Sequence, residues 1–370
     1  MHPCKYLASK RISFEKQLLQ KRSENCTLRP ESPMGTEPLS PDPRPFEGRP
    51  RAREANCPEV SVILPAYRSH ETVGGCLEAL RRQTFRGFEV IVVDSSPDEC
   101  TADVVRESFP EVHLIRPGRR MLPHTAREEG VRNARGGLLA FLDPDVYARP
   151  DWLSELVAAH RETGRPVVGS LSCNGERRLD VAIHLCKFSK WLPGGAPRPV
   201  DMSPTANMLI DRPRFEATGF DGDHMLADVV LTWRLVESGA TLWFVPRAEV
   251  AHHHLSTFGD FLRERYTRGV TFGELRAGWN HFGRGRSLLY LLVSALPVRL
   301  ARLLPLVARH CRGAGLSRQL LATFPLVLLG HGASLLGESR AYLRRLLARM
   351  PGKTGPHLPA PPSFRRFQRR

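Results

Sequence analysis

The chain has 370 residues, enough for one large domain with additions. Its 54 Lys and Arg against 38 Asp and Glu give a formal net charge of +16, which favours an anionic partner: nucleic acid, anionic lipid or a phosphorylated substrate. The eight cysteines are scattered without a CxxC pair, which argues against a disulfide scaffold or a zinc site and favours a reduced, cytoplasmic setting.

The first 57 residues differ in composition from the rest of the chain. Prolines recur between positions 30 and 50, and large apolar residues are few. Such a segment cannot sustain a packed core, so residues 1–57 are predicted to be a disordered, basic arm. Residues 1–20 lack the apolar core of a secretory signal, and none is expected.

Order is expected to begin near residue 60, where apolar, β-branched runs alternate with segments of helical spacing. Strands are predicted at residues 60–67, 88–94, 112–115 and 138–142, and helices at 71–83, 103–109 and 126–134. Strands alternating with helices in this way predict right-handed crossovers, a mostly parallel central sheet and an α/β fold.

The segment 138–145 stands out because five apolar residues run directly into Asp143-Pro144-Asp145. An unbroken apolar run is typical of a strand buried on both faces, and ligands bind beyond the carboxyl ends of such strands. Two carboxylates one residue apart suit Mg²⁺ or Mn²⁺ beside substrate phosphates. The alternative is an ordinary Asp-Pro-Asp turn that closes the strand.

Beyond Asp145 the pattern is less regular. Helices are predicted at residues 152–160 and 228–237, strands at 167–171, 206–210 and 242–245, and a loop at 194–197.

Polar residues at the ends of these elements, Asp94, Asp143, Asp145, Asp228 and His252, should converge on one edge of the sheet. Each has a structural alternative. Asp94 can cap the following helix, Asp228 can favour a helix dipole from its first turn, and His252 belongs to a run of three histidines.

In this order and spacing, five segments resemble a family-2 glycosyltransferase with the GT-A nucleotide-sugar-binding fold. They are residues 61–67, 71–83, 90–96, 126–130 and 141–145, and the likeness extends over residues 60–276. The chain departs from the family pattern where Ser95-Ser96 replaces a more acidic stretch, where Glu128 replaces a frequent Asn, and where Ala227 precedes Asp228 in place of Glu.

The resemblance implies a nucleoside pocket lined by Ala66, Tyr67, Glu71 and Asp94, with the Asp94 carboxylate accepting from the base. It also implies that Arg127 faces the nucleotide, where a guanidinium suits phosphate or ribose oxygens.

The resemblance further implies that Asp143 and Asp145 hold Mg²⁺ or Mn²⁺ against the donor diphosphate, with Asp143 also part of the nucleotide site. His252 lies where some relatives place a third metal ligand, with a structural or phosphate-contacting role as the alternative. Asp228 would be the general base, and Asp223 is a competing candidate.

For the acceptor, we expect contacts from Asn207 and Arg234, with Met208 and residues 194–199 shaping the pocket. Arg234 can instead anchor Asp228 or lie on a solvated helix face. The chain lacks the Gln-x-x-Arg-Trp motif of processive synthases near the base helix, so transfer of a single sugar is expected.

The tail contains two apolar segments, residues 287–308 and 320–336, flanked by arginines. The second approaches the length of a membrane-spanning helix, but an in-plane or re-entrant pair fits both lengths better, and buried core helices are the alternative. The predicted organisation is an arm (1–57), a GT-A domain (58–280), apolar membrane-associated helices (281–350) and a basic disordered tail (351–370).

Taken together, the sequence predicts a metal-dependent inverting glycosyltransferase that uses a nucleotide-diphospho-sugar and a lipid-linked or cell-surface glycan acceptor. It would act at the inner face of the cell membrane, as a peripheral or integral protein on an anionic surface. A nucleotidyltransferase and an inactive nucleotide-sugar-binding relative are the alternatives. No nucleic acid is expected as a partner, because the basic residues lack interleaved aromatics.

Overall fold

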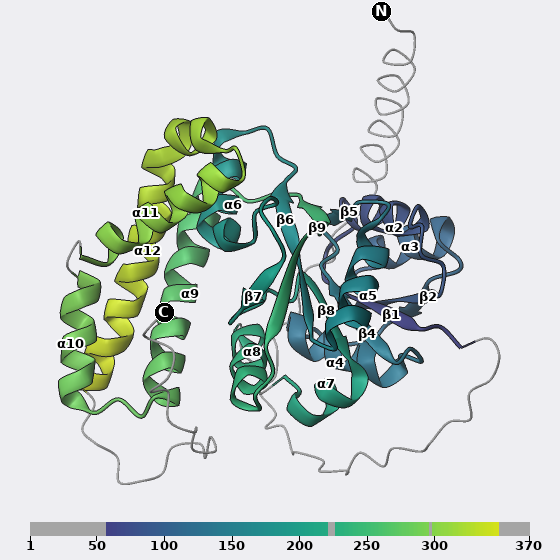
Figure 1. Ribbon diagram of the computed structural model, residues 1–370, viewed down its shortest axis with the longest axis horizontal. Helices are drawn as coiled ribbons and strands as arrows, with labels where there is room; N and C mark the ends of the chain where they lie inside the picture. The colour runs from purple at the N-terminus through teal and green to yellow at the C-terminus, as the bar shows by residue number, and fades with distance from the viewer. Residues whose placement is uncertain (1–56, 221–225, 296–297, 348–370) are drawn as a thin grey trace, which may run out of the picture.

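The computed structural model describes residues 57–220, 226–295 and 298–347. It has two parts: a sheet covered by helices, and a group of long helices at one side of the sheet (Figure 1). The predicted N-terminal arm and basic tail, and Asp223, lie outside the described residues.

One sheet runs through the first part. Its strands are β1 (Val60–Ala66), β2 (Phe88–Asp94), β3 (His113–Ile115), β4 (Leu138–Leu142), β5 (Val146–Ala148), β6 (Val167–Cys173), β7 (Arg198–Val200), β8 (Asn207–Asp211) and β9 (Leu242–His252). Their order is β3-β2-β1-β4-β8-β6-β9-β5, with β7 added against β9.

The helices are α2 (Val73–Arg81), α3 (Cys100–Ser108), α4 (Pro123–Asn133), α5 (Trp152–Thr163), α6 (Arg178–Phe188), a short 3₁₀ helix η1 (Ser189–Trp191), α7 (Arg212–Thr218), α8 (Ala227–Glu237), α9 (Phe258–Trp279), α10 (Arg284–Ala295), α11 (Val298–Gly313) and α12 (Ser317–Leu347).

The α/β prediction is confirmed, and its parallel part is the half of the sheet formed by β3, β2, β1 and β4. The other half is mixed, because β8 enters antiparallel to both β4 and β6. Every residue of β1 is buried, as expected for a strand covered on both faces. The carboxyl ends of β1, β2 and β4 therefore open on the same sheet edge.

Strand β9 is longer than predicted. The apolar pattern ended at residue 245, yet the strand continues to His252. Strand β9 extends this far because it has partners along its whole length. It pairs with β6 on one side, with a shift of register between Gly169 and Ser170, and with β5 and β7 on the other side. Strands β5 and β7 have three residues each, too few for an alternating pattern to identify.

The apolar C-terminal helices form a second core together with α6 and α9. Phe261 of α9, Cys186 of α6, Val307 and Cys311 of α11 and Val327 of α12 are buried in one cluster. Helix α9 thus packs with the tail, and the predicted boundary at residue 280 falls at the end of this shared helix. By length and composition α12 can cross a membrane, a test that core helices of soluble proteins also pass, and 33% of its most apolar window is buried.

Glycines allow α9 and α12 to approach closely. A Cβ atom on Gly269 would lie 2.0 Å from the carbonyl oxygen of Ser334, and one on Gly337 would lie 2.1 Å from that of Tyr266. Neither distance is sterically possible, so the backbones touch only because both positions lack a side chain. Gly332, also on α12, has open space around it.

We therefore expect Gly337→Ala to push α9 and α12 apart and to lower the free energy of unfolding by about 1–3 kcal/mol, the usual cost of overpacking. The matched substitution Gly332→Ala should be neutral or stabilising by up to about 1 kcal/mol, because alanine favours helix. Urea or thermal unfolding of both variants measures the difference. Equal stabilities would contradict the close packing of these helices.

Candidate functional site

The turn between β4 and β5 carries Asp143 and Asp145, and the pairing of β5 with the end of β9 brings His252 to this turn. Val146 is paired with His252 in the antiparallel register. The backbone N–H of His253 donates to the carbonyl oxygen of Asp145 at 2.7 Å. Two segments more than a hundred positions apart in the chain are thus joined at the candidate metal site.

The three predicted metal ligands lie together. One oxygen from each of Asp143 and Asp145 and one ring nitrogen of His252 all lie within 4.8 Å of one another. The Nε2 atom of His252 is 3.7 Å from Oδ2 of Asp145. Its Nδ1 atom is buried and has no hydrogen-bond partner among the described residues. Carboxylate oxygens with one imidazole form a donor set that suits Mn²⁺ or Mg²⁺.

The protonation states at this group also suit a cation. Burial and the neighbouring Asp143 raise the pKa of Asp145 to about 7. The two carboxylate charges repel each other at this site, and a bound cation would offset that repulsion. Burial and, next, the charge of Lys187 lower the pKa of His252 to about 4. The imidazole is therefore neutral at pH 7, which is its metal-binding form.

Arg127 lies beside these carboxylates. Its side chain, from α4, is 3% exposed and forms a close ion pair with Asp143. Its Nη1 atom faces Nδ1 of His124 at 3.3 Å, and its Nε atom is buried without a hydrogen-bond partner in the described chain. Arg127 thus lies beside the candidate metal ligands with Asp143 as its partner, and its contact with the nucleotide stays a prediction.

Asp228 lies in the first turn of α8, where its Oδ1 accepts from the Val229 N–H at 2.9 Å. Burial raises the pKa of this carboxyl group, whereas the charges of Arg268 and Arg127 lower it. Nη2 of Arg268 is 3.9 Å from Oδ2 of Asp228. Arg268 was not predicted, because the spacing of arginines along α9 does not indicate that this helix returns to Asp228.

The nucleoside end of the site lies where β1 ends. The carbonyl oxygen of Ala66 accepts from the Ser95 N–H at 2.9 Å, which ties the ends of β1 and β2 together. The Tyr67 ring carries the Arg120 guanidinium 4.7 Å from its centroid. Glu71 is exposed in the turn before α2. These residues lie at the expected edge of the sheet.

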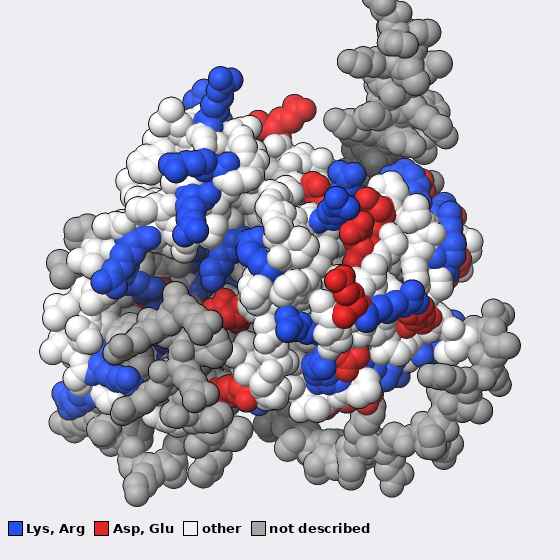
Figure 2. Space-filling view, viewed as in Figure 1, with Lys and Arg blue, Asp and Glu red and all other residues white. Residues whose placement is uncertain are grey.

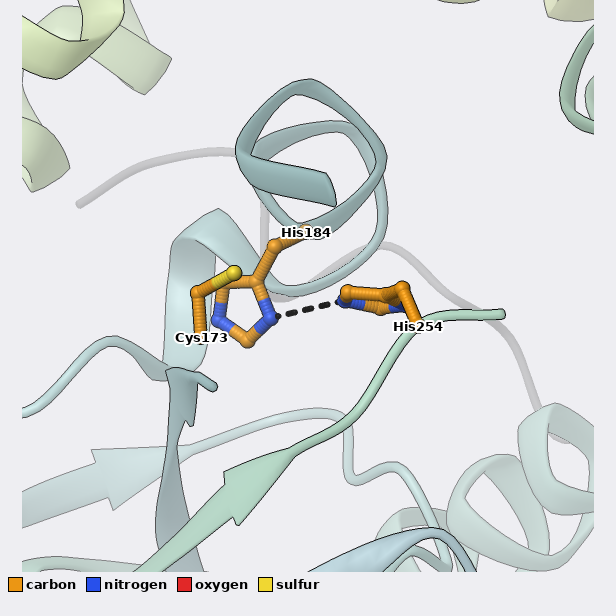
Figure 3. A group of neighbouring side chains, drawn as sticks. All are labelled: Cys173, His184 and His254. Carbon is orange, nitrogen blue, oxygen red and sulfur yellow. Dashed lines mark hydrogen bonds between the residues drawn. The ribbon is translucent and has the colours of Figure 1, made fainter. Parts of the chain in front are cut away.

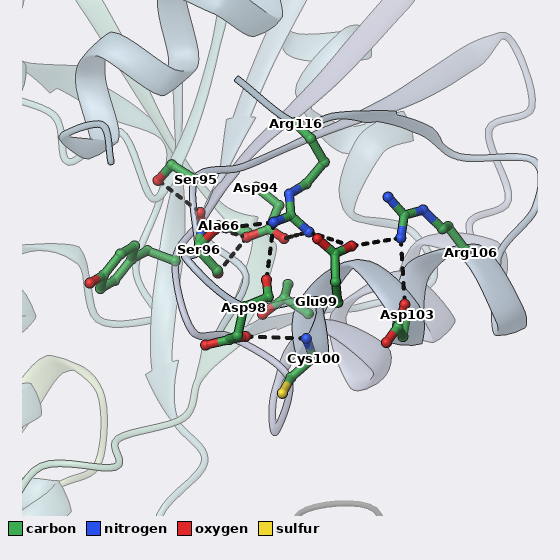
Figure 4. A network of polar contacts seen from close by, with 12 residues as sticks. Ala66, Asp94, Ser95, Ser96, Asp98, Glu99, Cys100, Asp103, Arg106 and Arg116 are labelled. Carbon is green, nitrogen blue, oxygen red and sulfur yellow. Dashed lines mark hydrogen bonds and ion pairs between the residues drawn. The ribbon is translucent and has the colours of Figure 1, made fainter. Parts of the chain in front are cut away.

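Asp94 is fully buried at the end of β2. Its Oδ1 accepts from the backbone N–H and the hydroxyl of Ser96, at 3.0 and 2.5 Å. Its Oδ2 lies 3.5 Å from Nη1 of Arg116, which also pairs with Glu99 at 2.9 Å (Figure 4). Burial raises the pKa of Asp94, and the Ser96 bonds oppose that rise. Arg116, which was not predicted, lies beside the oxygen of the carboxylate that is expected to accept from the base.

Asn207 does not fit the acceptor role predicted for it. Its side chain is 0% exposed. Its amide nitrogen donates to the carbonyl oxygens of Ser170 and Ala248 at 2.8 and 2.9 Å, and its oxygen accepts from the Trp152 indole at 2.8 Å. All of these bonds hold strands β6, β8 and β9 and helix α5 together, so Asn207 is a structural residue of the core.

The other acceptor candidates lie elsewhere. Met208, the neighbour of Asn207, is also fully buried in the core. Arg234 donates from Nη1 to the Thr218 carbonyl at 3.0 Å, and the arginine nearest to Asp228 is instead Arg268. Part of the predicted loop at 194–199 pairs with β9 as strand β7.

A second group, which was not predicted, consists of Cys173, His184 and His254 (Figure 3). The side chains come from β6, α6 and the segment after β9. Nδ1 of His184 is 3.3 Å from Nε2 of His254, and Nε2 of His184 is 3.1 Å from the Leu171 carbonyl oxygen. Burial lowers the pKa of His184 to about 3 and also lowers that of His254, so the two rings form a neutral hydrogen-bonded pair.

This pair supports the ring of His252. The rings of His252 and His254 stack with centroids 4.4 Å apart and planes 16° apart. Because His184 holds His254, and His254 lies flat against His252, the His252 ring is fixed with its Nε2 towards Asp145.

The chain is similar to known glycosyltransferases. Residues 61–201 match the model of glycosyl transferase family 2. Glycosyltransferase AglE of Haloferax volcanii is 26% identical over 220 residues, which are 57% of this chain and 72% of that protein. Validoxylamine A glucosyltransferase of Streptomyces hygroscopicus subsp. jinggangensis is 30% identical over 200 residues, which are 52% of this chain but only 47% of that protein.

Among solved structures, a similarity is found to a mannosyltransferase from Pyrobaculum calidifontis in complex with GDP-Man and Mn²⁺, with a TM-score of 0.49 and 19% identity, covering 79% of this chain and 88% of that chain. The curated relatives are glycosyltransferases, which leaves the nucleotidyltransferase alternative without support. The part of the chain that carries strands β1 to β7 thus matches glycosyl transferase family 2, and the relatives to which the chain is similar are glycosyltransferases.

Proposed function

We propose that this chain is a metal-dependent, inverting glycosyltransferase that moves one sugar from a nucleotide-diphospho-sugar to a hydroxyl group of a lipid-linked or cell-surface glycan. The observation that supports this most is the gathering of Asp143, Asp145 and His252 within 4.8 Å. The charges of both Arg127 and Asp143 act on the carboxyl group of Asp228 and change its pKa.

The donor would bind along the edge formed by β1, β2 and β4. Ala66, Tyr67, Glu71 and Asp94 would contact the nucleoside, and Arg127 would exchange its contact with Asp143 for one with the phosphates or ribose. Asp143, Asp145 and His252 would hold Mn²⁺ or Mg²⁺, which neutralises the charge of the departing nucleoside diphosphate when bound. The pair at Asp143 and Asp145 holds the leaving group and does not attack the sugar.

Asp228 would act as the general base. The acceptor oxygen forms a bond to the anomeric carbon while the bond from that carbon to the diphosphate oxygen breaks. The electron pair leaves with the diphosphate, and the hydroxyl proton passes to Asp228. A single in-line displacement of this kind inverts the anomeric centre.

The C-terminal helices would rest on the cytoplasmic face of an anionic membrane. Exposed leucines lie along α10 to α12, among them Leu321 at 79% and Leu336 at 65% exposure. On the face seen in Figure 2, Lys and Arg predominate over these helices, whereas Asp and Glu lie mostly over the sheet domain. Leucines among arginines favour an in-plane position at the interface over a spanning one.

We expect Asp228→Asn to lower kcat by about 10²–10⁴-fold, the usual contribution of a general base, with donor affinity nearly unchanged. Asp145→Asn should instead abolish the Mn²⁺-dependent thermal stabilisation by nucleotide-sugars, because it removes a ligand. A screen of nucleotide-sugars by thermal shift and sugar transfer measures both. Asp103→Asn, an exposed carboxylate on α3, is the control. Near-normal turnover of Asp228→Asn would exclude it as the base.

The pH profile tests the pairing of Asp228 with Arg268. A base must be deprotonated, so kcat/KM should fall as the pH drops through the pKa of Asp228. Since Arg268 lowers that pKa, Arg268→Met should move the acidic limb to higher pH. Arg263→Met, an exposed position on the same helix, should leave the limb in place. A limb that does not move in Arg268→Met would contradict the proposed pairing.

For the membrane, we expect the full-length chain to sediment with vesicles that contain anionic lipid and less with neutral ones. Substituting Leu321, Leu329 and Leu336 together by Gln should weaken vesicle binding at least tenfold, because each leucine contributes up to about 1.5–3 kcal/mol on burial. Leu255→Gln, an exposed leucine outside these helices, serves as the matched control. Equal binding of both variants would show that the leucines do not face the lipid.

A further inference from the structure

A cavity of about 820 Å³ lies between the sheet domain and the C-terminal helices, within the size range of small-molecule sites. It is bounded by the end of α6 with η1, the start of α8, and one face each of α9, α10, α11 and α12. Helices α6 and α8 to α12 are labelled in Figure 1. On α9 the lining positions Arg265, Arg268, Phe272 and Arg276 follow helical spacing, so one continuous face of this helix forms a wall.

One end of the cavity reaches the catalytic group. Leu226 and Val229, on either side of Asp228 in the chain, both line it. Arg268 lines it as well and lies 3.9 Å from the Asp228 carboxylate. A molecule in the cavity can therefore place a hydroxyl group at Asp228, which the proposed function requires of the acceptor.

The walls carry many more cations than anions. Lys187, Lys190, Arg265, Arg268, Arg276, Arg299 and Arg302 line the cavity, against Glu338 as the one acidic lining residue in the part of the chain that the structure describes. Glu338 is shared, because it accepts from Arg276 at 2.8 Å and from Arg299 at a still closer contact. The Glu338 carboxylate therefore forms ion pairs with two of the seven cationic side chains.

Arg265 and Arg302 form no direct ion pair within the described ranges, although the charges of Glu264 and Glu338 act on Arg265. The Nε atom of Arg265 is buried without a hydrogen-bond partner in these ranges, and Arg302 is exposed. A buried donor that lacks a hydrogen bond is costly unless an acceptor completes it. The planar fork of arginine matches phosphate oxygens in pairs, so phosphate is the group that these two side chains fit best.

The cavity also has apolar lining residues on α10 and α11. They are Leu289 and Val293 of α10 and Leu303 and Leu306 of α11, the helix that also carries Arg302. Leu289 is 55% and Leu306 38% exposed, so this apolar lining continues into the exposed leucines of the outer helical face. A ligand that satisfies both the cations and the apolar lining has an anionic group and a hydrocarbon chain.

We propose that this cavity binds the acceptor, and that the acceptor is a phosphate-bearing lipid whose phosphate contacts Arg265 and Arg302. Its hydrocarbon chain follows Leu289, Val293, Leu303 and Leu306 towards the outer face, and its reacting hydroxyl lies at Asp228. This assignment rests on the proposed function and deepens it by naming the class of acceptor.

The test uses the full-length chain without any nucleotide-sugar and with octyl phosphate as the probe. Binding is measured by calorimetry and by tryptophan fluorescence, since Trp191 lines the cavity. We expect octyl phosphate to bind at least tenfold more tightly than octanol, octanoate or inorganic phosphate. Equal binding of octanol would overturn the phosphate assignment, and so would equal binding of octanoate. Equal binding of inorganic phosphate would overturn the lipid assignment and indicate a site for the free anion.

Two variants locate the site. Arg265→Met and Arg302→Gln should each weaken octyl phosphate binding at least tenfold, whereas Arg263→Met, on the exposed side of α9, should not. Arg302 is exposed at the cavity mouth, so its variant tests the site even if Arg265→Met fails to fold. If Arg302→Gln binds octyl phosphate as tightly as the unaltered chain, the predicted phosphate contacts would be overturned, whatever the result for Arg265→Met.

The same variants separate this inference from the proposed function. Stabilisation by nucleotide-sugar with Mn²⁺ depends on the other end of the site and should persist in Arg302→Gln. If the unaltered chain binds the donor but does not bind octyl phosphate, the acceptor class alone would be overturned. Intact octyl phosphate binding without any donor binding would instead overturn the proposed transfer reaction.

Discussion

The antiparallel pairing of β5 with the end of β9 is the constraint on which the site depends. It extends β9 beyond its apolar part, sets Val146 opposite His252, and places the imidazole at the turn that carries Asp143 and Asp145. The same strand continues into the segment that leads to α9, and α9 supplies Arg268 to Asp228. One strand end therefore sets both the candidate metal ligands and the surroundings of the candidate base.

Much of the fold was predictable because it rests on local patterns. The apolar runs of β1, β2 and β4 and the helical spacing between them predict the parallel part of the sheet, and the carboxylates that end two of these strands predict where a ligand would bind. The contacts between segments that are far apart in the chain were not predictable. Nothing local shows that Val146 pairs with His252, or that Arg116 lies over Asp94.

The prediction for Asn207 failed for a related physical reason. A polar residue beside a strand suggests a ligand contact, but a buried amide is equally suited to hold strands together, and only its neighbours decide between the two. In the same way, the spacing of arginines along α9 is compatible with a solvated face. Only the packing of α9 against α12 shows which arginines turn inwards.

The close glycine contacts between α9 and α12 have a geometric consequence. Helix α9 has 22 residues, so at 1.5 Å per residue it is about 33 Å long. Because it begins beside the histidines of the site and is fixed along its length to α12, it behaves as a rigid strut. If α10 to α12 rest on a lipid surface, this strut sets the height of the reaction centre above that surface. The acceptor hydroxyl group would then be selected by its distance from the lipid surface as well as by its chemistry.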